Sequence, residues 1–436
     1  MAVKTGSVER LVGSYQAWAA NGASRVPAWL KDLREGGIRR FVELGFPNLK
    51  QEAWRFTSVA PIAETQFELA HPASRIPHLE EIQPFLVGEA GDRLVFVDGF
   101  FAPALSTSLP GGVRVASLAQ ALRENPETIQ HHLCKYAKTD ERPFCALNTA
   151  FVAEGAFVHV PAKLRVAEPI QLLFLTTTDR QVVVHPRNLV VVDREARASI
   201  VETYAALAEN VYWTNAVTEI VVGDGARVDY HRVQRESNRA FHVAATQSHQ
   251  GQGSTLNLHF VAFGSALARH DIGAVLAGPG GTLILNGLYL LAGAQHADHH
   301  TTIDHAADHC QSHEYFNGVL DGHSRGVFTG RIIVRPGAQK TDSKQTNNNL
   351  LLSADAHADS QPQLEIYADD VKCTHGSTVG PLDPRALFYL RSRGVGENEA
   401  RRLLTYGFAA EILGRVEVAP LRVQLDRIVR DRVAQP

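Results

Sequence analysis

Short apolar runs recur along the middle of the chain, from about Phe144 onward. They are rich in Val, Ile, Thr, Tyr and Phe, and Gly, Asp or Asn separates each run from the next, as in FVHVP, NLVVVD and TLILNGLYLL. Runs of this kind predict β-strands bounded by turns. No good helical pattern interrupts them until about residue 383, so an alternating βαβ fold is excluded.

Three all-strand architectures remain for this region: a sandwich, a propeller and a parallel β-solenoid. The chain has no blade repeat with a WD or kelch-like signature, which counts against a propeller. The runs also vary in length and spacing, which favours a solenoid whose coils stack on one another.

The N-terminal region has mixed patterns. Before residue 45, apolar residues such as Val8, Leu11 and Tyr15 recur at helical spacing. The segment RLVFVDGFF at 93–101 predicts a β-hairpin with its turn at Asp-Gly. A further helix is predicted from Ser117, a candidate N-cap, to about residue 133.

The C-terminal region returns to helix after Asp383 and Pro384, a pair that suits a first helical turn. We therefore divide the chain into a helical and mixed region (1–143), a β core (144–378) and a C-terminal helical region (379–436). Arginines outnumber acidic residues from residue 385 to the end. This is either a solvated helix face or a docking surface for an acidic partner. One predicted helix carries an apolar stripe of Leu403, Leu404, Phe408 and Ile412.

Composition narrows the function classes. The chain has 436 residues, 44% hydrophobic and 20% charged, with a formal net charge of −3. These values are typical of a soluble globular protein and argue against a surface built for nucleic acid. We find no signal-peptide pattern and no apolar run of the ~18 residues that a membrane span needs. Four scattered cysteines exclude a disulfide framework, so we expect a cytoplasmic protein: Cys134, Cys145, Cys310 and Cys373.

Common nucleotide-binding and catalytic motifs are missing from the sequence. It contains no GxxxxGK[ST], HExxH, GxSxG or CxxC. Any metal chemistry must therefore use a split site, a site shared with another chain, or histidines.

Histidines are concentrated in one stretch together with Asp298, Asp304, Asp308 and Cys310. Imidazole and carboxylate groups are the usual ligands of zinc, iron or manganese, but hydrogen-bonded histidines also stack along solenoid coils. We favour structural or interfacial roles for these histidines over a catalytic metal site. The stretch contains His296, His299, His300, His305, His309, His313 and His323.

A second candidate site is the pair Cys373 and His375. If this segment is a strand, the two side chains point to the same face, where they can serve as a pair of metal ligands. The alternative is a buried thiol beside a hydrogen-bonded imidazole. Two ligands do not complete a metal or cluster site, so the others would come from elsewhere, including another chain. The amide-rich stretch 339–350 indicates a structural Asn/Gln ladder.

Four segments together resemble one family: QHADHHTT at 295–302, the run at 316–334, AQKTDSKQTNNNLLLS at 338–353, and residues 369–380. The sequence resembles the SufB/SufD family of iron–sulfur cluster assembly proteins, densely over about 290–415 and more loosely upstream. The form DVKC-x-HG-x-TVG at 370–380 is similar to the SufD branch rather than the SufB branch.

The resemblance implies a mainly β fold, a right-handed parallel β-helix flanked by N-terminal and C-terminal α-helical regions. It implies a complex with SufB and the ABC-type ATPase SufC, in which this chain is a non-catalytic subunit. The β-helix would pair with SufB, and the C-terminal helices would dock SufC through the stripe named above. A transient iron–sulfur cluster would form at the SufB interface with His375 as a ligand and Cys373 beside it.

Other hypotheses remain open at this stage. One is a stand-alone metalloenzyme that uses the His296–His313 cluster, and another is a purely structural partner of SufB. The resemblance also leaves open whether the complex uses a flavin and whether the isolated chain forms a homodimer. Because the cluster is shared, we expect no cofactor bound tightly to the isolated chain.

Overall fold

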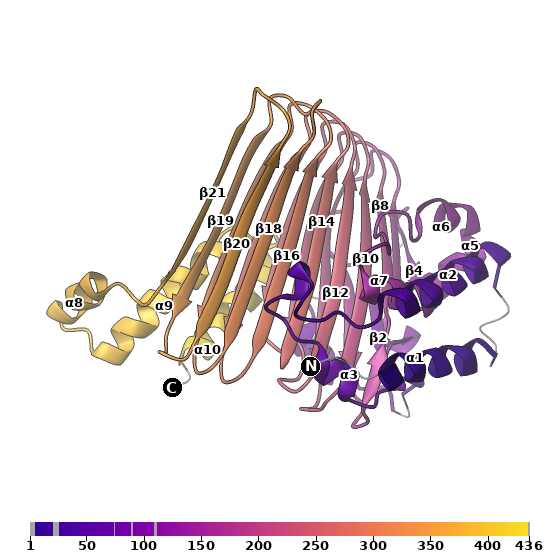
Figure 1. Cartoon of the computed structure of the whole chain (residues 1–436), viewed down its shortest axis with the longest axis horizontal. Coiled ribbons are helices and arrows are strands. Elements are labelled where there is room, and N and C mark those ends of the chain that lie inside the picture. The colour runs from indigo at the N-terminus through magenta and orange to yellow at the C-terminus, as the bar shows by residue number, and fades with distance from the viewer. Residues whose placement is uncertain (1–4, 21–25, 74, 89, 109–110, 435–436) are drawn as a thin grey trace.

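The computed structural model describes residues 5–20, 26–73, 75–88, 90–108 and 111–434. Its centre is a flattened parallel β-solenoid made of two facing sheets, here called sheets A and B (Figure 1). Successive coils place one strand in each sheet, so neighbouring strands within a sheet are one coil apart in sequence. This confirms the mainly β, parallel solenoid fold with helical regions at both ends.

In spatial order, sheet A contains β20 (His357–Ile366), β18 (Arg325–Val334), β16 (His296–His305), β14 (Leu267–Leu276), β12 (Phe241–Gln250), β10 (Trp213–Val222), β8 (Arg187–Val192), β5 (Ala156–Val160) and β4 (Arg114–Ser117), with β1 (Glu68–Leu69) and β7 (Val182–Val184) joined at its side. Sheet B contains β21 (Lys372–Gly380), β19 (Asp342–Leu351), β17 (Gln311–Leu320), β15 (Thr282–Leu291), β13 (Thr255–Ala262), β11 (Arg227–Arg235), β9 (Arg197–Ala206), β6 (Ile170–Thr176), β2 (Arg93–Val97) and β3 (Phe100–Phe101).

The main hydrophobic core lies between the two sheets. Alternate residues of each strand point inward, so Leu283 and Leu285 of β15 are fully buried there, as are Phe328 and Ile332 of β18. Full burial of one such side chain contributes roughly 1.5–3 kcal/mol. The stacked coils repeat this contribution along the whole solenoid.

One turn of each coil repeats with the same left-handed backbone conformation. Its central residue has φ of 65° at Gly225, 56° at His309 and 60° at Lys340. The N–H of this residue donates to a carbonyl in the next coil, at 2.8 Å from His309 to Gln339 and 2.7 Å from Lys340 to Asp370. Glycine suits this conformation best because it has no Cβ. His309 therefore has a turn role that the histidine count alone does not reveal.

The N-terminal region covers the first end of the solenoid. Its β2–β3 hairpin pairs with β6, and the predicted Asp-Gly turn has positive φ at both Asp98 and Gly99. Ser117 is confirmed as an N-cap, accepting the N–H of Gln120, and Asn125-Pro126 divides the helix predicted after it into two. The helices and 3-10 turns of this region are α1 (Thr5–Trp18), α2 (Ala28–Leu44), η2 (Glu52–Trp54), α3 (Ala60–Glu64), α4 (Leu79–Ile82), η3 (Gln83–Phe85), η4 (Pro103–Leu105), α5 (Leu118–Glu124), α6 (Pro126–His132) and α7 (Pro143–Ala150).

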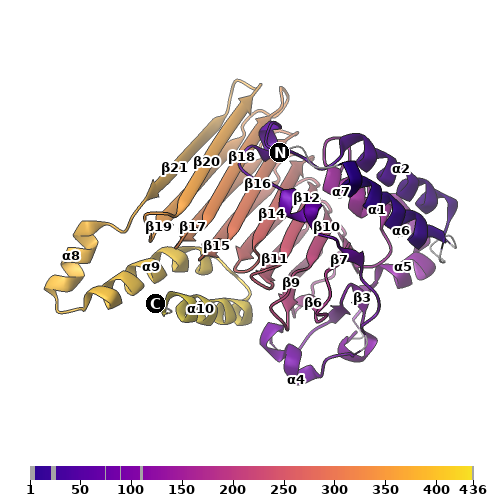
Figure 2. The ribbon, with the colours of Figure 1, turned by 60° about the horizontal axis from the view of Figure 1, so that its bottom comes forward.

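The C-terminal helices are α8 (Pro384–Ser392), α9 (Glu397–Leu413) and α10 (Ala419–Ala434). Helices α9 and α10 lie against sheet B, where Ile412 and Leu425 pack on outward-facing valines of its strands (Figure 2). Helix α8 projects away from the solenoid beyond β21 (Figure 1). Asp383 caps it by accepting the N–H of Arg385.

The other end of the solenoid is open. Strands β20 and β21 are the last strands of their sheets, and no described element pairs with their outer edges. Seven of the nine residues of β21 are exposed, and the other two, Cys373 and Gly380, are half-buried. In β19, the strand behind it, five of the ten residues are buried. An unpaired edge of this length offers a row of N–H and C=O groups to a second chain.

The structure also shows how the three sequence regions meet. Helix α7 falls within the expected β core, and strands β2 and β4 of the N-terminal region join the two sheets. Among the described residues, none of the helices combines the length and the apolar character that crossing a membrane requires.

Candidate functional site at the open end

Cys373 and His375 lie on β21, at the open end of the solenoid. Cys373 is in register with Ser343 of β19, and His375 is in register with Gln345. Ser343 and Gln345 are buried and face the interior. Both residues of the pair are therefore on the interior side of the last coil. Their spacing predicts that they share a face, and the register with β19 shows which face it is. Cys373 is half-buried and His375 is exposed.

The environment of Cys373 favours the protonated thiol. Burial, and then the nearby Asp342 carboxylate, raise the pKa of Cys373 above its ordinary value, while the backbone of Ser343 opposes this shift. A thiol must lose its proton to bind metal. Metal binding at Cys373 would therefore release a proton and would gain from further cationic or metal charge at the site.

A buried polar pair lies behind His375. Gln345 donates from Nε2 to Oε2 of Glu314 at 2.6 Å, and Glu314 is in register with Gln345 on β17. Burial raises the pKa of Glu314 to about 7, although the hydrogen bond from Gln345 opposes the shift. Sequence analysis did not single out either residue. The one sequence signal for Gln345 is its position within the amide-rich stretch 339–350. Its neighbours Glu314 and His375 follow only from the coil register.

The histidine-rich stretch is spread over both sheets and the turns between them. The His299 ring stacks on Tyr289 with centroids 5.0 Å apart, and His305 Nε2 lies 2.9 Å from Ser312 Oγ. His296 Nε2 lies 2.9 Å from the hydroxyl of Thr57. Within the part of the chain that the structure describes, no three His, Cys, Asp or Glu side chains are grouped so as to hold a metal ion. The contacts that are present are structural.

The amide ladder predicted in 339–350 is present in β19. Asn317, Asn348 and Thr378 are in register on three successive strands. Thr378 Oγ1 donates to Asn348 Oδ1 at 2.7 Å, and Asn348 Nδ2 donates to Asn317 Oδ1 at 3.4 Å. The ladder ties the exposed last strand to the coils behind it.

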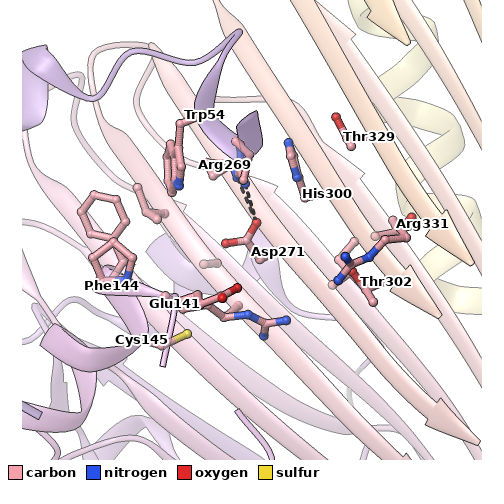
Figure 3. A pocket seen from close by; sticks show the side chains of 18 of the residues that line it. Trp54, Glu141, Phe144, Cys145, Arg269, Asp271, His300, Thr302, Thr329 and Arg331 are labelled. Carbon is pink, nitrogen blue, oxygen red and sulfur yellow. Dashed lines mark hydrogen bonds and ion pairs between the residues drawn. The ribbon is translucent and has the colours of Figure 1, made fainter. Parts of the chain in front are cut away.

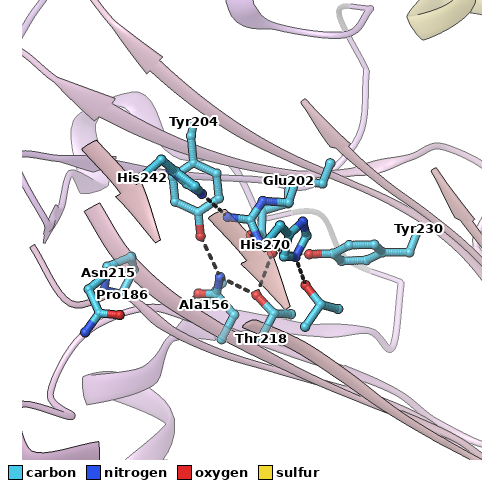
Figure 4. A network of polar contacts seen from close by, with 12 residues as sticks. Ala156, Pro186, Glu202, Tyr204, Asn215, Thr218, Tyr230, His242 and His270 are labelled. Carbon is cyan, nitrogen blue, oxygen red and sulfur yellow. Dashed lines mark hydrogen bonds and ion pairs between the residues drawn. The ribbon is translucent and has the colours of Figure 1, made fainter. Parts of the chain in front are cut away.

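Polar side chains also fill the solenoid interior nearer the N-terminal end (Figure 4). Glu202 accepts hydrogen bonds from Tyr230 and, at 2.9 Å, from Thr218. Arg232 lies over the Tyr204 ring and bonds to the rings of His242 and His270. These hydrogen bonds link side chains from several coils, so the network helps to fix the packing of successive coils.

A polar cleft of about 480 Å³ lies on the outer face of sheet A (Figure 3). Arg269 organises one wall: its guanidinium lies 4.1 Å from the Trp54 ring centroid and pairs with Asp298 at 2.5 Å and Asp271 at 2.8 Å. It also donates to the carbonyl of Ala53 at 2.8 Å. These contacts hold the N-terminal segment around Trp54 against the sheet.

The apolar stripe of α9 is divided between surface and core. Leu403 is 45% exposed, and Leu404 and Phe408 are half-buried beside a groove of about 350 Å³ against β21. Ile412 is 1% exposed and packs against sheet B, so it supports the helix from inside the chain and is not available at its surface. Docking by the other three residues stays a prediction.

The geometry defines a parallel β-solenoid protein with a thiol–imidazole pair at an uncovered end. Two family models match the chain: "SufBD protein N-terminal region" over residues 7–172 and "SUF system FeS cluster assembly, SufBD core domain" over residues 174–408. The chain belongs to the SufBD family of iron–sulfur cluster assembly proteins.

Individual relatives match over nearly their whole length. The iron–sulfur cluster assembly SufBD family protein slr0076 of Synechocystis is 35% identical over 92% of this chain and 91% of its own. The iron–sulfur cluster assembly protein SufD of Escherichia coli is 29% identical over 94% of both chains, and that of Bacillus subtilis is 28% identical over 93% and 94%. These matches confirm the family resemblance, including its similarity to SufD.

Proposed function

We propose that this chain is a non-catalytic, SufD-type subunit of a scaffold complex that builds iron–sulfur clusters. In this proposal its open end pairs with a SufB-type subunit, and its C-terminal helices bind the ATPase SufC. The observation that carries the proposal is the position of Cys373 and His375, on the interior side of the last strand at an unpaired edge. The four free cysteines suit a reducing compartment, so we place the complex in the cytoplasm.

The two open edges differ in their capacity to pair. Pro362 interrupts β20, and a proline cannot donate a ladder hydrogen bond. Strand β21 contains no proline from Lys372 to Gly380. Pairing through β21 would bring a partner directly to the thiol–imidazole pair, which supports a shared site there.

The ligand chemistry of the pair suits a cluster that is assembled and then released. A neutral imidazole binds iron, and replacing thiolates by imidazoles raises the potential of a cluster. Protonation of the imidazole in acid removes it as a ligand, which makes such a site more labile than four thiolates. The proposal takes His375 as a ligand and Cys373 as a candidate second ligand, and it assigns the remaining ligands to the SufB-type subunit. The cluster is the cargo of this complex.

The C-terminal helices offer a separate surface for SufC. Leu403 and the projecting helix α8, with Phe388 at 74% exposed, present apolar side chains to solvent. Leu404 and Phe408 line the groove between α9 and β21. This surface lies beside the open end. SufC bound there would be close enough to change the position of the paired edge when it hydrolyses ATP.

The decisive experiment is co-purification of the chain with SufB and SufC, followed by iron and sulfide analysis. His375→Ala is expected to lower the iron and sulfide content of the complex while the three subunits still assemble. His357→Ala is the matched control, because His357 is an exposed histidine on the other terminal strand. Full cluster content in the His375→Ala complex would leave the chain as a purely structural partner.

A second variant separates the possible roles of the thiol. Cys373→Ala should have a milder effect than His375→Ala if the thiol only packs against the last coil. A comparable loss would make Cys373 a ligand or a sulfur carrier.

A further inference from the structure

Gln345 has a buried amide oxygen without a hydrogen-bond partner. Its Nε2 donates to Oε2 of Glu314 at 2.6 Å, which fixes the orientation of the amide. Its Oε1 is buried and accepts no hydrogen bond from any residue that the structure describes. Leaving a buried acceptor unpaired costs about 1–3 kcal/mol, so this oxygen calls for an explanation.

The register places His375 next to this amide. Gln345 is flanked by Glu314 on one neighbouring strand and by His375 on the other, and all three residues lie at the same level of sheet B. Adjacent strands are about 4.8 Å apart, which is within reach of a side-chain hydrogen bond. The nitrogen end of the amide is engaged by Glu314, so the oxygen end is the one left for His375.

We propose that Gln345 is a positioning residue for His375: its Oε1 accepts a hydrogen bond from one ring N–H of His375 and leaves the other ring nitrogen unprotonated to bind iron. Histidines that bind metals usually donate their second ring N–H to such an acceptor, which fixes both tautomer and ring orientation. The hydrogen bond forms when a partner covers the open end and excludes water from the exposed imidazole. This inference rests on the proposed function of His375.

Gly330 of β18 makes room for this arrangement. A Cβ added at Gly330 would lie 2.2 Å from Nε2 of Gln345 and 2.9 Å from the Phe328 ring. Gly330→Ala would therefore displace the amide without changing it. Both Glu314 and Gly330 therefore lie at the nitrogen end of the amide, and neither contacts its oxygen by a hydrogen bond.

The first test compares Gln345 variants in the complex with SufB and SufC. Gln345→Met keeps the side-chain length but removes the acceptor, and iron binding measured by titration with Fe²⁺ should weaken about tenfold, the lower limit for loss of such a hydrogen bond. Asn347→Ala is the control, because Asn347 is a buried amide on the same strand that is in register with Ser377. Equal losses of iron binding in Asn347→Ala and Gln345→Met would overturn a specific role for Gln345.

The second test reads the tautomer of His375 without iron. The complex is prepared with ¹⁵N-labelled histidine, and the His375 signals are assigned by their loss in His375→Ala. One tautomer should dominate in the wild type, and Gln345→Met and Gly330→Ala should both give a mixture. An unchanged tautomer ratio in both variants would overturn the inference.

A double substitution separates this inference from the proposed function. If Gln345 acts through His375, Gln345→Met should cause no further loss of iron in the His375→Ala background. If His375→Ala loses iron but Gln345→Met does not, the positioning role alone is overturned. If His375→Ala also keeps its iron, the proposed function fails as well.

Discussion

At the scale of single residues, strand alternation and coil register decide which side chains meet. The spacing of Cys373 and His375 was enough to predict that they share a face, because that relation is local to one strand. The pairing of Gln345 with Glu314 and His375 could not be predicted, because these residues come from three coils of different length. The histidines at 296–323 show the converse. They are close in sequence, but they lie on different faces and turns of the solenoid and do not form a cluster in space.

Protonation of His299 should make the protein sensitive to acid. Burial lowers the pKa of His299 to about 4, against an ordinary value near 6.5. Below pH 6.5 the unfolded chain takes up a proton that the folded chain refuses, so stability is lost as the pH falls from 6.5 to 4. At pH 5 the loss from this group is about 2 kcal/mol.

His299→Phe keeps an aromatic ring against Tyr289 but cannot titrate. The free energy of unfolding, measured with urea at pH 7 and pH 5, should therefore fall less in this variant than in the wild type. His323→Phe, at an exposed turn, is the control. Identical pH dependence in all three proteins would contradict the prediction.

Ionisation of Glu314 should lower the stability of the fold as the pH rises from about 4.3 to neutral. Burial raises its pKa to about 7. Because the unfolded chain loses this proton above about pH 4.3, stability is lost as the pH rises from there to 7, by about 3–4 kcal/mol in total. Glu314→Gln should raise the free energy of unfolding at pH 8 and change it little at pH 4.5. A gain of the same size at both pH values would argue against ionisation as its cause.

At the scale of elements, the sequence predicted those features that depend on only a few neighbouring residues. The 93–101 hairpin, the Ser117 cap and the α9 helix are confirmed because turn residues, caps and periodicity act within a few residues. The stripe on α9 was predicted as one surface, but its last member, Ile412, is buried against sheet B. Periodicity identifies an apolar face without identifying which part of it the rest of the chain covers.

Leu403→Asp should weaken capture of SufC. Leu403 is 45% exposed, so a charge there leaves the fold of the chain intact but removes an apolar contact worth roughly 1.5–3 kcal/mol if a partner buries it. Pull-down of purified SufC should fall by at least tenfold. Val423→Asp is the control, because Val423 is an apolar residue of α10 that is 69% exposed. Equal capture by wild type and Leu403→Asp would remove this part of α9 from the docking surface.

At the scale of the whole molecule, the two ends of the solenoid differ in whether the chain covers them. The first end is covered by the β2–β3 hairpin and by antiparallel pairing of β4 with β5, whereas the described chain leaves β20 and β21 uncovered. The strand pattern predicted a solenoid but could not predict this asymmetry. Whether an end is covered depends on which segments from elsewhere in the chain pack against it. A terminal coil without a cap normally requires a partner for solubility.

A charge on the interior side of β21 should therefore block pairing with a second chain. Ser377 is exposed on that side, two residues from His375, and it bonds to Ser360 of β20 at 2.9 Å. Ser377→Lys places an ammonium where a partner would exclude water, and desolvating it opposes association. Thr374→Lys adds the same charge to the same strand on the opposite face, so it is the matched control. In sedimentation experiments, Ser377→Lys should reduce both self-association of the isolated chain and its association with SufB, and Thr374→Lys should retain them. Retention of both associations by Ser377→Lys would show that partners bind this chain elsewhere and would separate the thiol–imidazole pair from the interface.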